Sequence, residues 1–148
     1  MSQPPDYLFL GPLVWIVGWV AASIVFRLNR GKPFYPRAPD NAIYRETWGS
    51  GRSLDTIWGR LGGASNCLII AVTPDELVVT PRFPFNLMFM PEIYGLEMTA
   101  RRSRVRLENP TSGFFRDRVI VSTDGADARR MQLKLRDREE FMAALTAR

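Results

Sequence analysis

Arginine side chains provide the most concentrated chemical function in this chain. Arg101, Arg102, Arg104 and Arg106 form its densest cationic cluster. In a β-strand, alternate side chains project to the same face, so the last three would form a stripe with neighbours about 7 Å apart. Guanidinium groups bind carboxylates and phosphates through paired hydrogen bonds. The cluster therefore predicts a surface for lipid phosphates or an acidic partner; the alternative is a strand face that is only solvated.

Residue types that usually perform catalysis are scarce. The chain contains no histidine and a single cysteine, Cys67. Without histidine, the Ser-His-Asp and Cys-His nucleophile systems and the usual zinc ligand sets are absent. Cys67 begins an apolar run, so we interpret it as a small buried side chain. The sequence therefore predicts neither an enzyme nor a metal or cofactor site.

The segment from Arg82 to Gly95 combines prolines with large apolar side chains. Phe85, Met88 and Phe89 are its candidates for contact with lipid or with a partner protein, because apolar patches of that size seldom face water. Packed inward, the same side chains would close an open end of the domain. Aromatic and methionine side chains are more often buried than exposed, which favours this second arrangement.

The N-terminal region contains an uncharged run of 20 residues, from Tyr7 to Phe26. A helix rises about 1.5 Å per residue, so this run spans roughly 30 Å, the thickness of the hydrocarbon core of a bilayer. It predicts a transmembrane anchor whose helix starts before Pro12, since a start at Pro12 leaves too short a span. The alternative is a cleaved signal peptide, although no Lys or Arg precedes the run. The expected anchor residues are Tyr7, Trp15, Gly18, Trp19, Ala22, Phe26, Arg27 and Arg30.

Charges on the two flanks of this run predict its orientation. A single Asp6 precedes it, and a cationic group follows it: Arg27, Arg30, Lys32 and Arg37. Cationic flanks stay on the cytoplasmic side, so we expect the N-terminus outside the cell inner (plasma) membrane and the following domain in the cytoplasm. Gly18 and Ala22 lie one helical turn apart and would let another membrane helix approach closely. Membrane lipid and one or more membrane-protein subunits are therefore the expected partners.

The remaining chain divides into a proline-rich tether, residues 31–41, and a β-rich domain, residues 42–148. In the domain, apolar and polar residues alternate, which is typical of strands with one buried face. Gly49-Ser50-Gly51 is predicted to be a turn, and 53–61 a short helix capped by Ser53, with Leu54, Ile57, Trp58 and Leu61 on one face. The predicted strands are 42–48, 67–73, 77–80, 96–100, 104–108, 117–123 and 130–136.

The order of these elements resembles the pleckstrin-homology-like superfold, including its short bacterial members. The hairpins at Cys67–Thr80 and Asp117–Arg136 carry the resemblance, together with the amphipathic helix expected at Asp137–Arg148. It covers residues 42–148 and implies about seven antiparallel strands with a C-terminal helix closing one end. Residues 61–73 and 84–97 also resemble stretches of small bacterial membrane proteins of unassigned activity.

A basic domain on a membrane anchor predicts an interaction protein. The net charge is +5, which favours anionic partners. We expect a single-pass accessory or scaffolding protein whose β domain docks on a membrane protein complex or on the anionic leaflet. The alternative is a membrane-tethered nucleic-acid-binding module, which requires aromatic side chains between exposed arginines. Phe114 and Phe115 beside Arg116 are its only candidates, so nucleic acid is not the expected partner.

Overall fold

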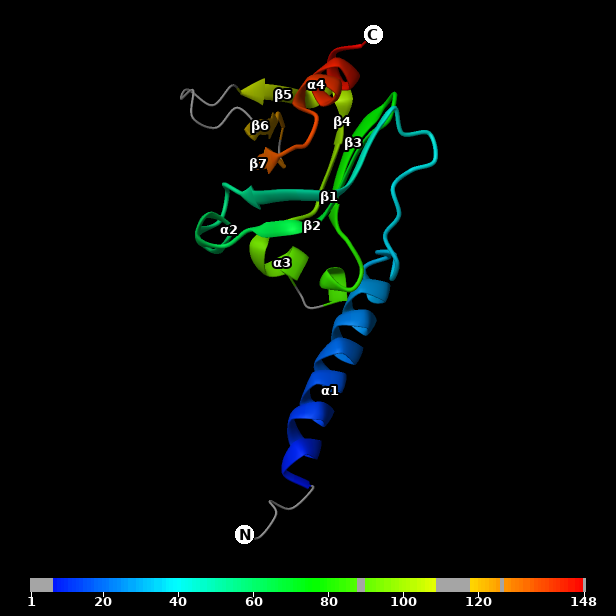
Figure 1. The fold of residues 1–148 in the computed structure, drawn as a ribbon, viewed down its shortest axis with the longest axis vertical. Helices are drawn as coiled ribbons and strands as arrows, with labels where there is room; N and C mark the ends of the chain where they lie inside the picture. Colours follow the sequence, from blue (N-terminus) through cyan, green and yellow to red (C-terminus); the bar gives the residue numbers. More distant parts are fainter. Residues whose placement is uncertain (1–6, 88–89, 109–117, 126, 148) are drawn as a thin grey trace.

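The computed structural model describes residues 7–87, 90–108, 118–125 and 127–147. One long helix, α1 (Tyr7–Asn29), projects from a β-rich domain (Figure 1). The helix includes Pro12, so it begins before that proline, as the sequence predicts. Its stretch from Leu10 to Asn29 is long and apolar enough to cross a membrane. Most of the apolar side chains along this stretch are exposed, because the domain covers only the end of the helix.

The described strands form one antiparallel sheet of seven, in the order β4-β3-β2-β1-β7-β6-β5. The edge strands β4 and β5 are consecutive in the chain and are separated only by residues 102–104, so the sheet must curl until its two edges approach each other there. The predicted combination of an N-terminal apolar helix, seven antiparallel strands and a C-terminal helix is confirmed. The strands are β1 (Tyr44–Ser53), β2 (Ala64–Val72), β3 (Glu76–Pro81), β4 (Met98–Arg101), β5 (Val105–Glu108), β6 (Arg118–Thr123) and β7 (Arg130–Lys134).

Strand β1 continues through the glycines that were expected to form a turn, so that prediction is wrong. A Cβ on Gly51 would lie only 2.9 Å from the carbonyl oxygen of Gln132 on β7. A Cβ on Gly49 would lie 2.4 Å from Cδ1 of Ile70 on β2. The pairing of β1 with β2 shifts register on both sides of Gly49. The glycines therefore let a central strand bend while both neighbours stay close.

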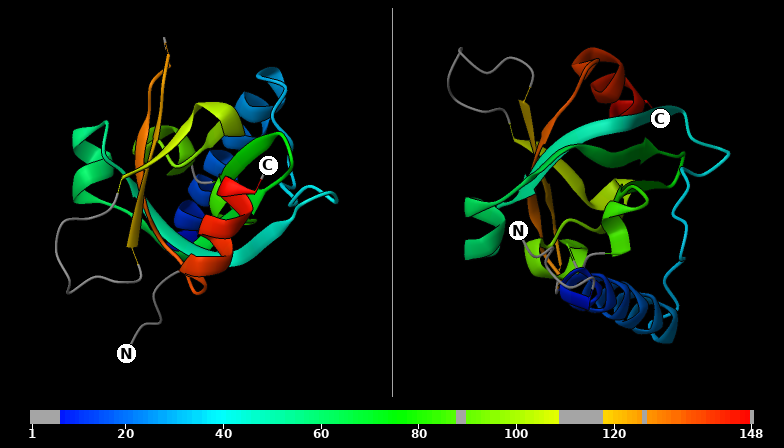
Figure 2. Two further views of the ribbon diagram at one scale, coloured as in Figure 1. Left: turned by 90° about the horizontal axis from the view of Figure 1, so that it is seen from above. Right: turned by 60° about the horizontal axis from the view of Figure 1, so that its bottom comes forward.

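The short helices lie at the two ends of the domain (Figures 1 and 2). At the end beside α1 are α2 (Ile57–Leu61), the 3-10 turn η1 (Phe85–Leu87) and α3 (Met90–Tyr94), while α4 (Arg138–Thr146) covers the opposite end. Helix α2 is shorter than predicted, and its cap is Thr56, whose Oγ1 accepts a hydrogen bond of 2.9 Å from the backbone N–H of Gly59. The hydroxyl of Ser53, the predicted cap, accepts from the N–H of Asp55 instead.

Helix α4 starts and packs as its sequence predicts. The carboxylate of Asp137 accepts a hydrogen bond of 2.9 Å from the N–H of Glu140. Phe141 is fully buried, and its ring meets the edge of the Tyr44 ring at a centroid distance of 5.3 Å. The Tyr44 hydroxyl donates to Oε2 of Glu46 at 2.7 Å. Burial is the larger cause, and this hydrogen bond the next, of a pKa of Tyr44 well above its ordinary value. The helix therefore closes the core against β1.

Replacing Phe141 with alanine should open this end of the core. Loss of a buried phenylalanine costs about 3–5 kcal/mol, which is roughly a hundredfold or more in the population of opened molecules. The thiol of Cys67 reports the opening, because it is buried and burial raises its pKa, so the folded protein reacts slowly with thiol reagents. We expect F141A to be labelled at Cys67 far faster than the wild type. The control A143S changes an exposed position of α4, and equal labelling of F141A and this control would contradict the packing described.

Candidate functional site

The junction between α1 and the domain is built around a buried arginine. Arg27 lies in the last turns of α1 and is only 1% exposed. Its Nη1 lies 3.4 Å from Oε1 of Glu92 on α3, and its Nη2 lies 2.7 Å from Oε1 of Glu97, just before β4. One guanidinium therefore joins the helix to two carboxylates that come from a distant part of the chain.

A second cation completes this ion-pair group. Nζ of Lys32 contacts Oε2 of Glu97 and lies 3.7 Å from Oε1 of Glu92. We call Arg27, Lys32, Glu92 and Glu97 the Arg27 junction; its two cations and two carboxylates balance in charge. In the sequence, Arg27 and Lys32 are two of the cationic residues that predict the orientation of the helix. In the structure, their partners are carboxylates of the domain.

Several polar atoms at the junction are buried without a hydrogen-bond partner among the described residues. They are Oγ of Ser23, Nε of Arg27 and Oε2 of Glu92. Ser23 is fully buried, one helical turn before Arg27. The domain therefore covers the side of α1 that carries Ser23 and Arg27, over more than the final turn. A buried ion pair with incomplete hydrogen bonding adds little stability but fixes geometry strongly, since separating its charges is costly.

The segment after β3 packs against the proline-rich tether that follows α1. The side-chain amide of Asn86 is buried and donates a hydrogen bond of 2.8 Å to the carbonyl of Phe34 in the proline-rich tether. The ring of Phe83 lies 5.8 Å from that of Phe34 and 5.5 Å from that of Tyr35. The tether therefore packs on the domain, beside the end of α1.

Burial of this segment is mixed, whereas the sequence favoured burial throughout. Leu87 is buried, but Phe83 and Phe85 are each more than a third exposed. The other two candidates for partner contact, Met88 and Phe89, lie outside the described residues. Phe85 is therefore the one member of that predicted set that the structure places, at the end of the domain beside α1.

The predicted arginine stripe is wrong, because its residues do not share a strand. Arg101 ends β4, and residues Arg102–Arg104 form a 3-10 turn, η2, before β5 begins at Val105. Such a turn breaks the alternation of side chains that a strand would impose. The four guanidinium groups consequently have different surroundings.

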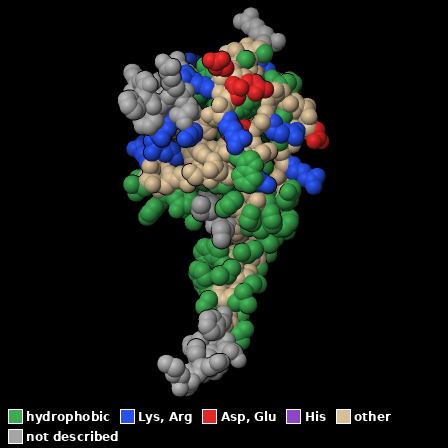
Figure 3. Space-filling model, viewed as in Figure 1, with side chains coloured by type: hydrophobic (Ala, Val, Ile, Leu, Met, Phe, Trp, Pro, Cys, Tyr) green, Lys and Arg blue, Asp and Glu red, His purple; other side chains and the backbone are tan. Residues whose placement is uncertain are grey.

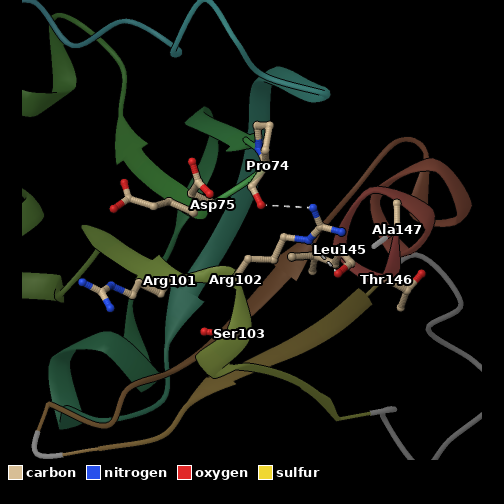
Figure 4. Close-up of a pocket in the computed structure, with 9 residues that line it drawn as sticks. Pro74, Asp75, Arg101, Arg102, Ser103, Leu145, Thr146 and Ala147 are labelled. Atoms are coloured by element: carbon tan, nitrogen blue, oxygen red, sulfur yellow. Dashed lines mark hydrogen bonds between the residues drawn. The ribbon is translucent and has the colours of Figure 1, made fainter.

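The Arg102 side chain forms hydrogen bonds within the domain. Its Nε donates to the carbonyl of Leu145 at 2.9 Å, and its Nη1 donates to the carbonyl of Pro74 at 3.2 Å (Figure 4). The carbonyl of Leu145 belongs to the last turn of α4, where helical carbonyls have no intrahelical donor. Arg102 thus links the helix end to the β2–β3 turn across an open cavity of about 770 Å³.

The other three arginines of the cluster are exposed. Arg106 forms an ion pair with Asp124, in the turn between β6 and β7. Arg101 lies opposite Glu76 in the β3–β4 pairing. Within the described part of the chain, the side chains of Arg101 and Arg104 form no ion pair. These two remain the members of the cluster whose charge is available to an outside partner.

The residues expected to form the membrane anchor lie in α1, except Arg30, which directly follows its last residue. The rings of Trp15 and Trp19 stack at 5.7 Å, and both are exposed. A Cβ on Gly18 would meet nothing within 4 Å, and Ala22 is also exposed, so the Gly18–Ala22 face has no cover from the described domain. Of the remaining predicted anchor residues, Tyr7 begins the helix, and the guanidinium of Arg30 lies 4.3 Å from the centre of the Phe26 ring.

The acidic partners of Arg27 were missed in the sequence, although a signal for them exists. Glu92 and Glu97 are the only charged residues between Arg82 and Arg101. Two carboxylates in such an apolar stretch require partners if the stretch is buried. The separation of 65 and 70 residues from Arg27 hides the pairing from any local pattern.

Substituting Arg27 with methionine should loosen the junction while keeping the apolar stem. The variant leaves Glu92 with only Lys32 nearby, and removing one partner of a buried ion pair costs about 3–5 kcal/mol. We expect faster backbone hydrogen exchange in residues 90–97 of the detergent-solubilised protein. The triple variant R27M/E92Q/E97Q removes the unpaired charges and should recover part of the protection. The matched control is R30A at an exposed position, and wild-type exchange in R27M would show that the junction holds nothing in place.

Comparison with family models, curated proteins and solved structures found no match to this chain. Within the described chain, the Arg27 junction connects the apolar helix to the domain through buried side chains.

Proposed function

We propose that the protein is a single-pass membrane-anchored accessory or scaffolding protein. In this proposal α1 is the anchor, and the basic β domain works without catalysis at the cytoplasmic face of the membrane. The observation that carries the proposal is the Arg27 junction, because it joins the apolar helix to the domain through buried contacts. A helix held in this way positions the domain at a set height and rotation.

A retained anchor accounts for α1 better than a cleaved signal peptide does. Small residues at Val20-Ala21-Ala22 are the candidate signal-peptide cleavage site, and they lie inside a continuous helix. Ser23 follows them directly, Arg27 lies one turn further on, and both are buried. The remaining apolar side chains of α1 have no protein cover in the described chain, and lipid is the solvent that suits such a surface.

We further propose that the domain belongs to the pleckstrin-homology-like superfold. The support is the strand order, in which β1–β4 and β5–β7 form two consecutive antiparallel runs that join through the β1–β7 pairing. Helix α4 follows β7 directly and covers one end of the curled sheet. Domains with this architecture serve many functions, so the role rests on the surfaces and not on the fold.

Two surfaces are free to meet a partner. The small-residue face of α1 at Gly18 and Ala22 suits a second membrane helix. At the opposite end of the molecule, the exposed guanidinium groups of Arg101 and Arg104 suit an acidic protein surface. A protein partner that offers a membrane helix and an acidic cytoplasmic face would satisfy both surfaces together.

The topology can be tested with single cysteines in a C67S background. We expect a cysteine at position 2 (S2C) to react with a membrane-impermeant maleimide in intact cells. A cysteine on the exposed face of α4 (A143C) should react only after the membrane is permeabilised. The protein should stay in the membrane pellet at alkaline pH. Recovery of a soluble product that lacks the first residues would show that α1 is a signal peptide and would remove the proposal.

The accessory role predicts that the protein forms a stable complex with another membrane protein. After mild solubilisation, the full chain should co-purify with at least one membrane-protein subunit. The double variant R101E/R104E should lower the yield of that subunit, because it reverses the charge of both exposed arginines. The matched control R136E reverses one exposed arginine elsewhere in the domain. A protein that is always recovered alone by mass spectrometry would contradict the role, and equal yields from the two variants would exclude this surface.

A further inference from the structure

We propose that exposed apolar side chains on the short helices and loops at the α1 end of the domain insert into the lipid leaflet. This inference rests on the membrane anchor proposed above and adds a second contact with the same membrane. The occupant to which it commits is the boundary between phospholipid head groups and acyl chains. We call this set of side chains the apolar collar; its members are Ile57, Trp58 and Leu61 of α2, Phe83 and Phe85 near η1, and Ile93 of α3.

Helix α2 is packed with its apolar side outward. Ile57, Trp58 and Leu61 share one face, as the sequence predicts, yet they are 73%, 64% and 80% exposed. The residue turned toward the sheet is Gly59, and a Cβ there would lie 2.8 Å from the carbonyl oxygen of Ser53. A helix with this pattern normally buries its apolar face. Within the described chain nothing covers that face, so an apolar medium outside the domain is the natural complement.

The collar is continuous with the anchor through direct contacts. Gly62, directly after α2, meets the ring of Tyr94 on α3 so closely that a Cβ would lie 2.4 Å from Cε1. Helix α3 in turn carries Glu92, which pairs with Arg27 of α1. Figures 1 and 2 show α2, α3 and η1 gathered at the end of the domain from which α1 leaves. The anchor therefore sets the position of the collar.

The depth of α1 places this end of the domain at the lipid boundary. Ser23 is buried by the domain, and it precedes Arg27 by four residues, or about 6 Å along the helix axis. Residues 7–26 form the apolar run, so the groups that cover Ser23 lie beside the apolar part of the helix. Amphipathic elements at membrane surfaces bury their apolar faces about 5–10 Å into the same boundary. The collar and the covered part of α1 are therefore at comparable depth.

The distribution of charge also suits a position at the boundary between head groups and acyl chains. Figure 3 shows hydrophobic side chains gathered at the end of the domain beside α1, with Lys and Arg side chains above them. Glu92 and Glu97, the acids nearest the helix, are neutralised within the Arg27 junction. Arg60 lies on α2 itself, and the Arg82 guanidinium, next to Phe83, stacks 3.9 Å from the centre of the Trp48 ring. Arginine and tryptophan are the side chains that favour the head-group layer.

Fluorescence of Trp58 tests the depth of the collar in the full chain. The variant W15F/W19F/W48F keeps Trp58 as its sole tryptophan and is reconstituted into vesicles of phosphatidylcholine and phosphatidylglycerol. We expect lipids brominated near the carbonyl end of the acyl chains to quench Trp58, and its emission to shift to shorter wavelength than that of tryptophan in water. Adding I57E and L61E, both at exposed positions, should abolish the quenching without unfolding the domain.

Two control chains separate this inference from the anchor itself. A chain with Trp15 alone reports α1, and quenching of Trp15 by bromines deep in the bilayer is expected if α1 is inserted. A chain with its sole tryptophan at position 143 (A143W) reports the far end of the domain and should not be quenched.

Quenched Trp15 with unquenched, water-exposed Trp58 overturns the collar and leaves the anchor intact. Trp58 that is shielded from aqueous quenchers but untouched by brominated lipid also overturns it, because a protein then covers the collar. Unquenched Trp15 refutes the anchor.

Discussion

Burial of one guanidinium determines how the helix and the domain are related. A charge removed from water is tolerated only when other charges and hydrogen bonds compensate for it, so Arg27 cannot leave Glu92 and Glu97 without a large penalty. The contact restricts both the rotation of the domain about α1 and its height along the helix. Helices α2 and α3 are therefore positioned together with α1, since α3 carries one of the two carboxylates and α2 contacts α3.

Much of the fold could be predicted because each element has a local signal. The alternation of Met131, Leu133 and Leu135 with polar residues marks β7, and Asp137 marks the start of α4. The errors arise where tertiary contacts override local preference. Gly51 was interpreted as part of a turn, but its missing side chain is what lets β1 pass close to β7. The three-residue turn at 102–104 interrupts an apparent strand that alternation alone would have continued.

The candidate site was less accessible to sequence reasoning. Arginine after an apolar helix is typical of a membrane flank, and nothing in the neighbouring residues indicates that Arg27 is buried. Its partners lie 65 and 70 residues away, and only the folded chain brings them together. The apolar face of α2 was predicted, but a helical period does not say whether that face points inward. Gly59, on the opposite side, decides the direction by allowing the helix backbone to approach Ser53.

The long separation between Arg27 and its carboxylates has a consequence for biosynthesis. A ribosome makes about 5–20 residues per second, so Arg27 is synthesised roughly 3–13 s before Glu92 exists. During that interval the guanidinium is an unpaired cation directly after an apolar segment. In the proposed anchor, the same side chain therefore first directs the nascent helix across the bilayer, as an unburied positive charge. It forms the buried ion pairs that hold the domain against the helix only after Glu92 and Glu97 have been synthesised.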